Sequence, residues 1–212
     1  GAQANLQSLP RTLLQDVATF PFCRCTSYSC PDSPYYLDAP VVTMGAGLAP
    51  GMSLVCLPLI VRAGGCGSSQ GPCCDMLAAS LHKIGIKTSK SCVGQVASVM
   101  VDGKKQSYQY ESPATASEAV IKIMPLRLNI GTANNKWICL TVRAPCADPK
   151  TLFATSDLSR ISYYMSEASE HVCCPTCNVH GDVLAPLASS PPPPPQMPLP
   201  PAPPNPDAPP PP

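Results

Sequence analysis

Cysteine is the residue type with the greatest chemical potential in this chain, which holds 13 cysteines among 212 residues. Thiols at this density either pair as disulfides in an oxidising compartment or bind metal in a reducing one. Because 13 is an odd number, the chain can form at most six intramolecular disulfides, and one thiol is left over. The disulfide candidates are Cys23, Cys25, Cys30, Cys56, Cys66, Cys73, Cys74, Cys92, Cys139, Cys146, Cys173, Cys174 and Cys177.

The spacing of the cysteines limits their pairing without deciding it. Cys23 and Cys25 would point to the same face of a strand, so we expect them to reach two different partners. The adjacent pairs Cys73-Cys74 and Cys173-Cys174 are each expected to connect two other segments rather than to close on themselves. The connectivity itself stays open at this level.

A zinc site is the alternative for the last cysteines. Cys174-x2-Cys177-x2-His180 places three soft ligands at the spacing of a zinc knuckle, and Cys173 could be the fourth. Zinc would also require a second ligand pair at a suitable distance and a reducing compartment. The ten other cysteines favour disulfides, so we predict no metal site.

Residues for acid–base or nucleophilic catalysis are scarce. Glu167 and Glu170 are the acids nearest one another, and their polar surroundings indicate a solvated surface. The chain has 3 histidines and lacks both HExxH and GxSxG. Cys66 in its glycine-rich loop fits a disulfide better than a nucleophile. We therefore predict no catalytic residues, no cofactor and no enzyme.

Charge and hydropathy exclude two further classes of protein. Only 13% of the residues are charged and the net charge is +1, which argues against a nucleic-acid binder. No run of 18 or more apolar residues is present, so no membrane span is expected.

A proline-rich tail differs sharply from the rest of the chain. Residues 191–212 contain 15 of the 29 prolines and no cysteine. Such a segment adopts polyproline II and spans roughly 70 Å at about 3.1 Å per residue. We favour a stiff spacer that carries sugar over a docking ligand for an aromatic groove. Since no N-x-S/T sequon exists, glycans would be O-linked, and the hydroxylation or O-glycosylation candidates are Ser189, Ser190, Pro191, Pro192, Pro193, Pro194 and Pro195.

The elements that must position these residues are mostly strands. Periodicity predicts one clear helix over residues 73–84, ended by Gly85, and a short helix capped by Asp148. Asp102-Gly103 predicts a hairpin turn, and Pro58 indicates a sheet edge or a bulge. The predicted strands are 41–44, 53–62, 92–101, 107–110, 119–124, 137–143 and 161–165.

The predicted organisation has three parts. Residues 1–19 form an N-terminal segment with leucines near helical spacing, 20–187 a Cys-rich domain, and 188–212 the polyproline rod or linker. The predicted fold class is α+β and β-rich, a single disulfide-stapled domain with one clear helix followed by a polyproline II rod.

Several short motifs, taken in order, resemble the pherophorin domain of volvocine green algae over about residues 20 to 187. The proline rod is the other hallmark of that family. The motifs are Phe20-Pro21-Phe22-Cys23-x-Cys25, Ser33-Pro34-Tyr35-x-Leu37, Cys73-x3-Leu77, Lys83-Ile84, Cys92, Ile138-Cys139-Leu140-Thr141 with Cys146, and Cys173-Cys174-Pro175.

The resemblance implies a secreted, hydroxyproline-rich glycoprotein of an extracellular matrix, cell wall or flagellar surface. The family has no catalytic residues to carry over, and its implied partners are O-linked glycans, other matrix glycoproteins or further copies of the chain. A lectin-like head on a stalk is the alternative, and it would need an exposed aromatic platform. Its candidate residues are Tyr35, Tyr36, Tyr108, Tyr110, Trp137, Tyr163 and Tyr164.

Overall fold

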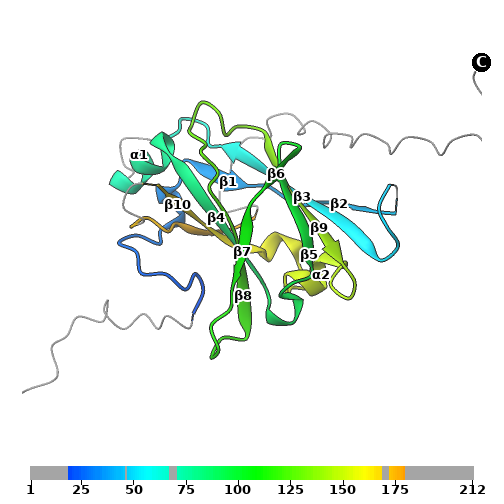
Figure 1. Cartoon of the computed structure of the whole chain (residues 1–212). Coiled ribbons are helices and arrows are strands. Elements are labelled where there is room, and N and C mark those ends of the chain that lie inside the picture. Colours follow the sequence, from blue (N-terminus) through cyan, green and yellow to red (C-terminus); the bar gives the residue numbers. More distant parts are fainter. Residues whose placement is uncertain (1–18, 46, 67–70, 169–171, 180–212) are drawn as a thin grey trace, which may run out of the picture.

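The structure is a computed structural model that describes residues 19–45, 47–66, 71–168 and 172–179 (Figure 1). Residues 1–18 of the N-terminal segment, with its leucines near helical spacing, lie outside the described residues, as do His180 of the alternative zinc set and the polyproline rod.

Two antiparallel sheets form the body of the domain (Figure 1). Sheet 1 has the order β1-β3-β9-β5-β6, and β2 also pairs with β3. Its strands are β1 (Tyr35–Leu37), β2 (Val41–Met44), β3 (Met52–Val61), β5 (Val96–Val101), β6 (Lys104–Gln106) and β9 (Lys136–Arg143). Sheet 2 has the order β11-β10-β4-β8-β7. Its strands are β4 (Leu81–Ser89), β7 (Tyr108–Glu111), β8 (Glu118–Ile123), β10 (Ser162–Glu167) and β11 (Thr176–Asn178).

One large core lies between the two sheets. Alternation along the strands sends Val55 and Leu57 of β3 into this core, while Cys56 between them joins a smaller cluster on the outer face of sheet 1. A hydrogen bond also links the two sheets through the core. The Tyr163 hydroxyl of sheet 2 accepts it, at 3.0 Å, from the backbone N–H of Leu37 in sheet 1. The expected β-rich domain is therefore confirmed.

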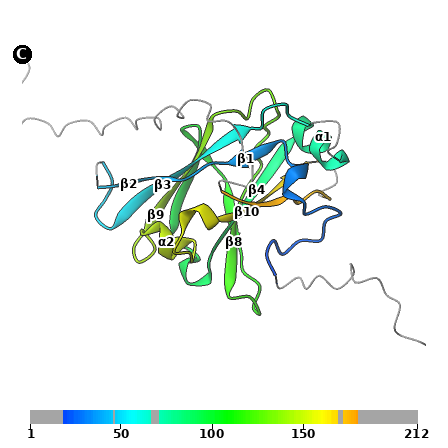
Figure 2. The ribbon, with the colours of Figure 1, turned by 180° about the vertical axis from the view of Figure 1, so that it is seen from behind.

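The helices lie at the periphery of this body. Helix α1 (Pro72–Ala79) lies at one end and the β2–β3 hairpin at the opposite end (Figure 1, Figure 2). The remaining helical elements are α2 (Pro149–Leu152) and the 3-10 turns η2 (Cys30–Asp32), η3 (Lys90–Cys92) and η4 (Leu158–Arg160). Across the described residues, no helix has the length and apolar character needed to cross a membrane.

The predicted helix is confirmed only in its first part. It ends at Ala79, and the backbone of Ser80 is already extended, with φ −157°. Residues 81–84, expected to complete the helix, instead begin strand β4, which pairs with both β8 and β10. Gly85 is therefore not a helix stop but a central residue of sheet 2, opposite Lys122 and Tyr164.

Pro58 is neither at a sheet edge nor in a bulge, which corrects the expectation. Strand β3 pairs with β9 without a shift in register, and its other side is shared by β1 and β2. Pro58 lies at the break between those two partners, where its carbonyl accepts a bond of 2.9 Å from Asp38 N–H. Proline has no N–H to donate, and at this position neither β1 nor β2 needs a backbone hydrogen bond from β3.

The predicted turn signals are confirmed. Asp102 and Gly103 have φ of 52° and 75° and connect β5 to the short strand β6. The Asp148 side chain accepts bonds from the N–H groups of Lys150 and Thr151, as an N-cap should.

Candidate functional site

Six disulfides pair twelve of the cysteines and leave Cys23 as the free thiol. Both adjacent cysteine pairs connect to other segments, as the spacing predicts. The six are Cys25–Cys174, Cys30–Cys177, Cys56–Cys139, Cys66–Cys74, Cys73–Cys173 and Cys92–Cys146.

The beginning and the end of the described domain are joined side by side. Three disulfides tie the segment 172–179 to residues more than 90 positions earlier, with sequence separations of 149, 147 and 100. Backbone bonds follow the same path: Cys174 N–H donates to Ser27 O at 2.9 Å, and Thr176 N–H donates to Tyr28 O at 3.1 Å. The Cys-rich ends of the domain therefore form one covalent seam.

Glu167 holds this seam in place, which corrects its interpretation as a surface residue. Its side chain is buried, with 0% exposure. Its carboxylate accepts a bond of 2.8 Å from Val172 N–H and one of 3.3 Å from Cys173 N–H. A buried carboxylate is costly unless it is hydrogen-bonded, and here it satisfies the backbone just ahead of Cys174. Glu170 lies outside the described residues.

The substitution Glu167→Gln is expected to lower the free energy of unfolding by about 1–3 kcal/mol. Glutamine keeps the shape but turns an NH2 group toward one of the two N–H donors, which leaves a buried donor without an acceptor. Urea unfolding measures the effect. The matched control is Glu118→Gln, because Glu118 forms a half-exposed ion pair with Lys87 and should cost less than about 1 kcal/mol. Equal losses in the two variants would contradict the assigned role.

A cluster of three sulfurs lies at the seam. The Sγ of Cys23 is 3.0 Å from the Sγ of Cys174 and 3.7 Å from the Sγ of Cys25. The expectation that Cys23 and Cys25 reach different partners is therefore wrong, since both sulfurs adjoin Cys174. The physical reason is that neither cysteine lies in a strand, so the alternation on which the expectation depended does not apply.

One hydroxyl group shapes the Cys23–Cys25 segment. The Tyr28 hydroxyl donates to the carbonyl of Cys23 at 2.8 Å and accepts from the N–H of Cys25 at 2.9 Å. Beside it, Phe22 has φ of 62° and is only 5% exposed, packed in a cluster with Val120 and Tyr164. A left-handed conformation at a bulky residue is strained and persists because the surrounding packing determines it. The backbone at Cys23 is thus held by the Tyr28 hydroxyl on one side and by the packing of Phe22 on the other.

Burial decides the protonation state of the free thiol. It raises the pKa of Cys23 to about 11, against the opposing effect of Lys83 and Lys122, while Glu111 adds to the rise. Burial also lowers the pKa of the Lys83 ammonium and raises the pKa of the Tyr164 hydroxyl. At neutral pH Cys23 is therefore a protonated thiol beside a disulfide.

Alkylation of Cys23 in the folded protein is expected to rise about tenfold per pH unit up to a midpoint near pH 11. The protonated thiol is the favoured form, so its contribution to stability is complete below the reference pKa of 9.0 and is lost as pH rises through about 11. The rate of iodoacetamide labelling measures the profile. The urea-unfolded chain is the control, and a folded-state midpoint at or below that of the control would contradict the assignment.

The chemistry open to the cluster follows from its oxidation state. The three Sγ atoms lie within 4.8 Å of one another, close enough to share a soft metal ion if all three were thiolates. With Cys25 and Cys174 paired, only Cys23 has a thiol to offer, and the arrangement suits thiol–disulfide chemistry. The alternative zinc set is divided, since Cys173, Cys174 and Cys177 belong to three different disulfides.

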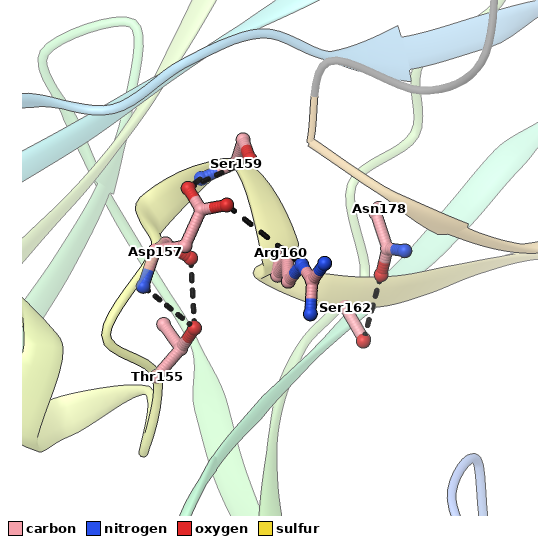
Figure 3. Close-up of polar contacts among 6 residues, drawn as sticks. All are labelled: Thr155, Asp157, Ser159, Arg160, Ser162 and Asn178. Atoms are coloured by element: carbon pink, nitrogen blue, oxygen red, sulfur yellow. Dashed lines mark hydrogen bonds and ion pairs between the residues drawn. The ribbon is translucent and has the colours of Figure 1, made fainter.

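An exposed polar network where β10 begins consists of local capping contacts (Figure 3). The Asp157 carboxylate accepts from Ser159 N–H at 2.9 Å and lies 3.7 Å from Arg160 Nε. Ser162 Oγ donates to Asn178 Oδ1 at 2.8 Å, which joins β10 to β11. These contacts stabilise a turn and a strand pair.

None of the seven aromatic candidates for a sugar-binding platform is exposed. Tyr36 is half-buried, with the Arg62 guanidinium 5.8 Å from its ring centre. The hydroxyls of Tyr108 and Tyr110 bond to the backbone of Val96. The buried members of the set are Tyr35, Trp137, Tyr163 and Tyr164. The lectin-like alternative stays a prediction.

Two packed antiparallel sheets and six disulfides place the chain in the class of small Cys-rich β-domains, an architecture typical of extracellular proteins. A family model described as Pherophorin matches residues 20–175. The chain belongs to the pherophorin family, as the resemblance predicts, and this is a family of structural extracellular-matrix glycoproteins. No curated protein and no solved structure matches the chain significantly.

Proposed function

We propose that this chain is a non-enzymatic structural module of an extracellular matrix, cell wall or flagellar surface. The disulfide-tied domain serves as a rigid head, and the proline-rich segment serves as a spacer that carries O-linked sugar. Its partners are other matrix glycoproteins or further copies of the same chain.

The long-range disulfides carry this proposal. Five of the six disulfides span 54 or more positions: three tie helix α1 and the N-terminal residues to the segment 172–179, one joins β3 to β9 within sheet 1, and one joins η3 to Cys146. Each such link restricts the unfolded chain and contributes about 2–4 kcal/mol. A head built in this way keeps its shape outside the cell, where no chaperone refolds it and proteases remove unfolded chains.

The disposition of the charged residues supports a structural role. Lys122 pairs with Glu111 at 2.5 Å and Lys87 with Glu118 at 3.0 Å, both across neighbouring strands. Glu167 is bonded to the backbone. The carboxylates of Glu111, Glu118 and Glu167 therefore stabilise the fold, since each is paired with a lysine or with backbone N–H groups.

Secretion of the full chain from a green-algal cell tests the proposal. We expect the chain in the isolated wall or matrix fraction, with a mass that falls on glycosidase treatment and a non-reduced form that keeps its disulfides. The matched variant carries alanine at Ser189, Ser190 and Pro191–Pro195, and should lose both the glycan mass and retention in the matrix. Recovery inside the cell with reduced cysteines, or equal retention of the variant, would contradict the proposal.

A further inference from the structure

We propose that Cys23, Cys25 and Cys174 form a thiol–disulfide exchange site, in which Cys174 pairs alternately with Cys25 and with Cys23. The odd cysteine of the chain is then the third member of a reactive group. This inference goes beyond the structural function and does not depend on where the protein is located.

The geometry of the three sulfurs carries the proposal. Cys23 Sγ lies 3.0 Å from Cys174 Sγ, so the exchange requires no change of fold, only side-chain rotation that brings the attacking sulfur in line with the Cys174–Cys25 bond. In the part of the chain that the structure describes, these are the three cysteines whose sulfurs gather within 4.8 Å. The exchange therefore has one defined location.

The step is balanced within the chain. The Cys23 thiol loses its proton and its thiolate attacks Cys174 Sγ, so that the Cys23–Cys174 bond forms as the Cys174–Cys25 bond breaks. Cys25 leaves as a thiolate and takes up a proton from water. One disulfide and one thiol are present before and after, so no oxidant or reductant is needed.

Neighbouring groups position the exchange and set its pH dependence. The Tyr28 hydroxyl bonds to the backbone of both Cys23 and Cys25, and this bridge keeps the two sulfurs close to Cys174 Sγ. The charged and titratable groups that act on Cys23 are Lys83 of β4, Lys122 of β8, Glu111 of β7 and Tyr164 of β10. Since the thiolate is the attacking form, exchange is slow at neutral pH and fast in alkali.

Trypsin separates the two competing cysteines, because Arg24 lies between them. The full chain is equilibrated at about pH 9, quenched in acid, labelled with N-ethylmaleimide under denaturing conditions and digested without reduction. Peptide 12–24 carries Cys23 as its single cysteine. We expect two fractions of this peptide. One is maleimide-labelled, from chains in which Cys25 is paired with Cys174, and the other is released only on reduction, from chains in which Cys23 is paired with Cys174. Peptide 12–24 that is fully labelled without reduction would overturn the proposal.

Two variants sharpen the test. In the Cys25→Ser variant we expect peptide 12–24 to carry no maleimide label, because Cys23 then forms the disulfide with Cys174. A chain in which Cys23 and Cys174 are both labelled would overturn the proposal. Cys30→Ser is the matched control, since its partner Cys177 adjoins no free thiol in the described residues and should become labelled.

Tyr28→Phe tests the positioning role. Loss of the hydroxyl is expected to slow re-equilibration about two- to tenfold. Tyr36→Phe, which lies away from the sulfurs, should leave the rate unchanged, and equal rates in both variants would contradict the role of Tyr28.

Discussion

Replacing both Cys73 and Cys173 with alanine is expected to lower the free energy of unfolding by about 4 kcal/mol. This buried disulfide has a sequence separation of 100 and joins α1 to the C-terminal seam. Its removal frees a long loop in the unfolded chain, which the remaining disulfides shorten only in part. Guanidinium unfolding of the oxidised protein measures the loss.

The paired control is the double substitution of Cys66 and Cys74 with alanine. That disulfide closes a loop of sequence separation 8, so its removal should cost about 2.5 kcal/mol. Because both disulfides hold neighbouring residues of α1, local effects on the helix are similar. A larger loss from the short loop than from the long one would contradict the proposed dependence on chain restriction.

Gly85→Ala is expected to destabilise the domain by about 3 kcal/mol. A Cβ atom at Gly85 would lie 2.5 Å from Cζ and 2.7 Å from Cδ1 of Tyr164, which is closer than atoms in contact can approach. The ring of Tyr164 is buried, packed in a cluster with Phe22 and Val120, so moving it away from the new Cβ would disturb these contacts. The thermal midpoint and the urea midpoint should both fall.

The matched control for this prediction is Gly131→Ala, because a Cβ there would meet its nearest neighbour, Asn129 Oδ1, only at 3.4 Å. Its effect should be below about 0.5 kcal/mol. In a Gly85→Ala, Tyr164→Ala double variant, the two losses should be less than additive, since the clash is removed with the ring. Full additivity would show that the ring is not the cause.

The strands were largely predictable from the sequence, and the failures have identifiable causes. Leu77, Leu81 and Ile84 fit helical spacing, but Ile84 and Ile86 also fit the alternation of a strand. Pairing with β8 and β10 on both sides decides in favour of the strand, and such pairing is a tertiary effect. Local signals such as Asp102-Gly103 succeeded because a turn depends on its own residues.

The site was less predictable than the fold. The odd number of cysteines correctly predicts a leftover thiol, yet no spacing places Cys23 beside Cys174, which is 151 positions away. Their contact depends on the Tyr28 hydroxyl and on the burial of Phe22. Glu167 was missed because its polar neighbours suggest a surface, while its burial arises from the returning segment 172–179.

Counting free thiols in the intact, non-reduced chain tests the central claim most directly. The oxidised protein is unfolded in guanidinium with an alkylating reagent, and its mass is compared with that of a reduced sample. The account predicts one alkyl group per chain before reduction, because six disulfides hold the other cysteines, and 13 afterwards. Labelling of most cysteines without reduction would contradict the claim that six disulfides hold the domain together.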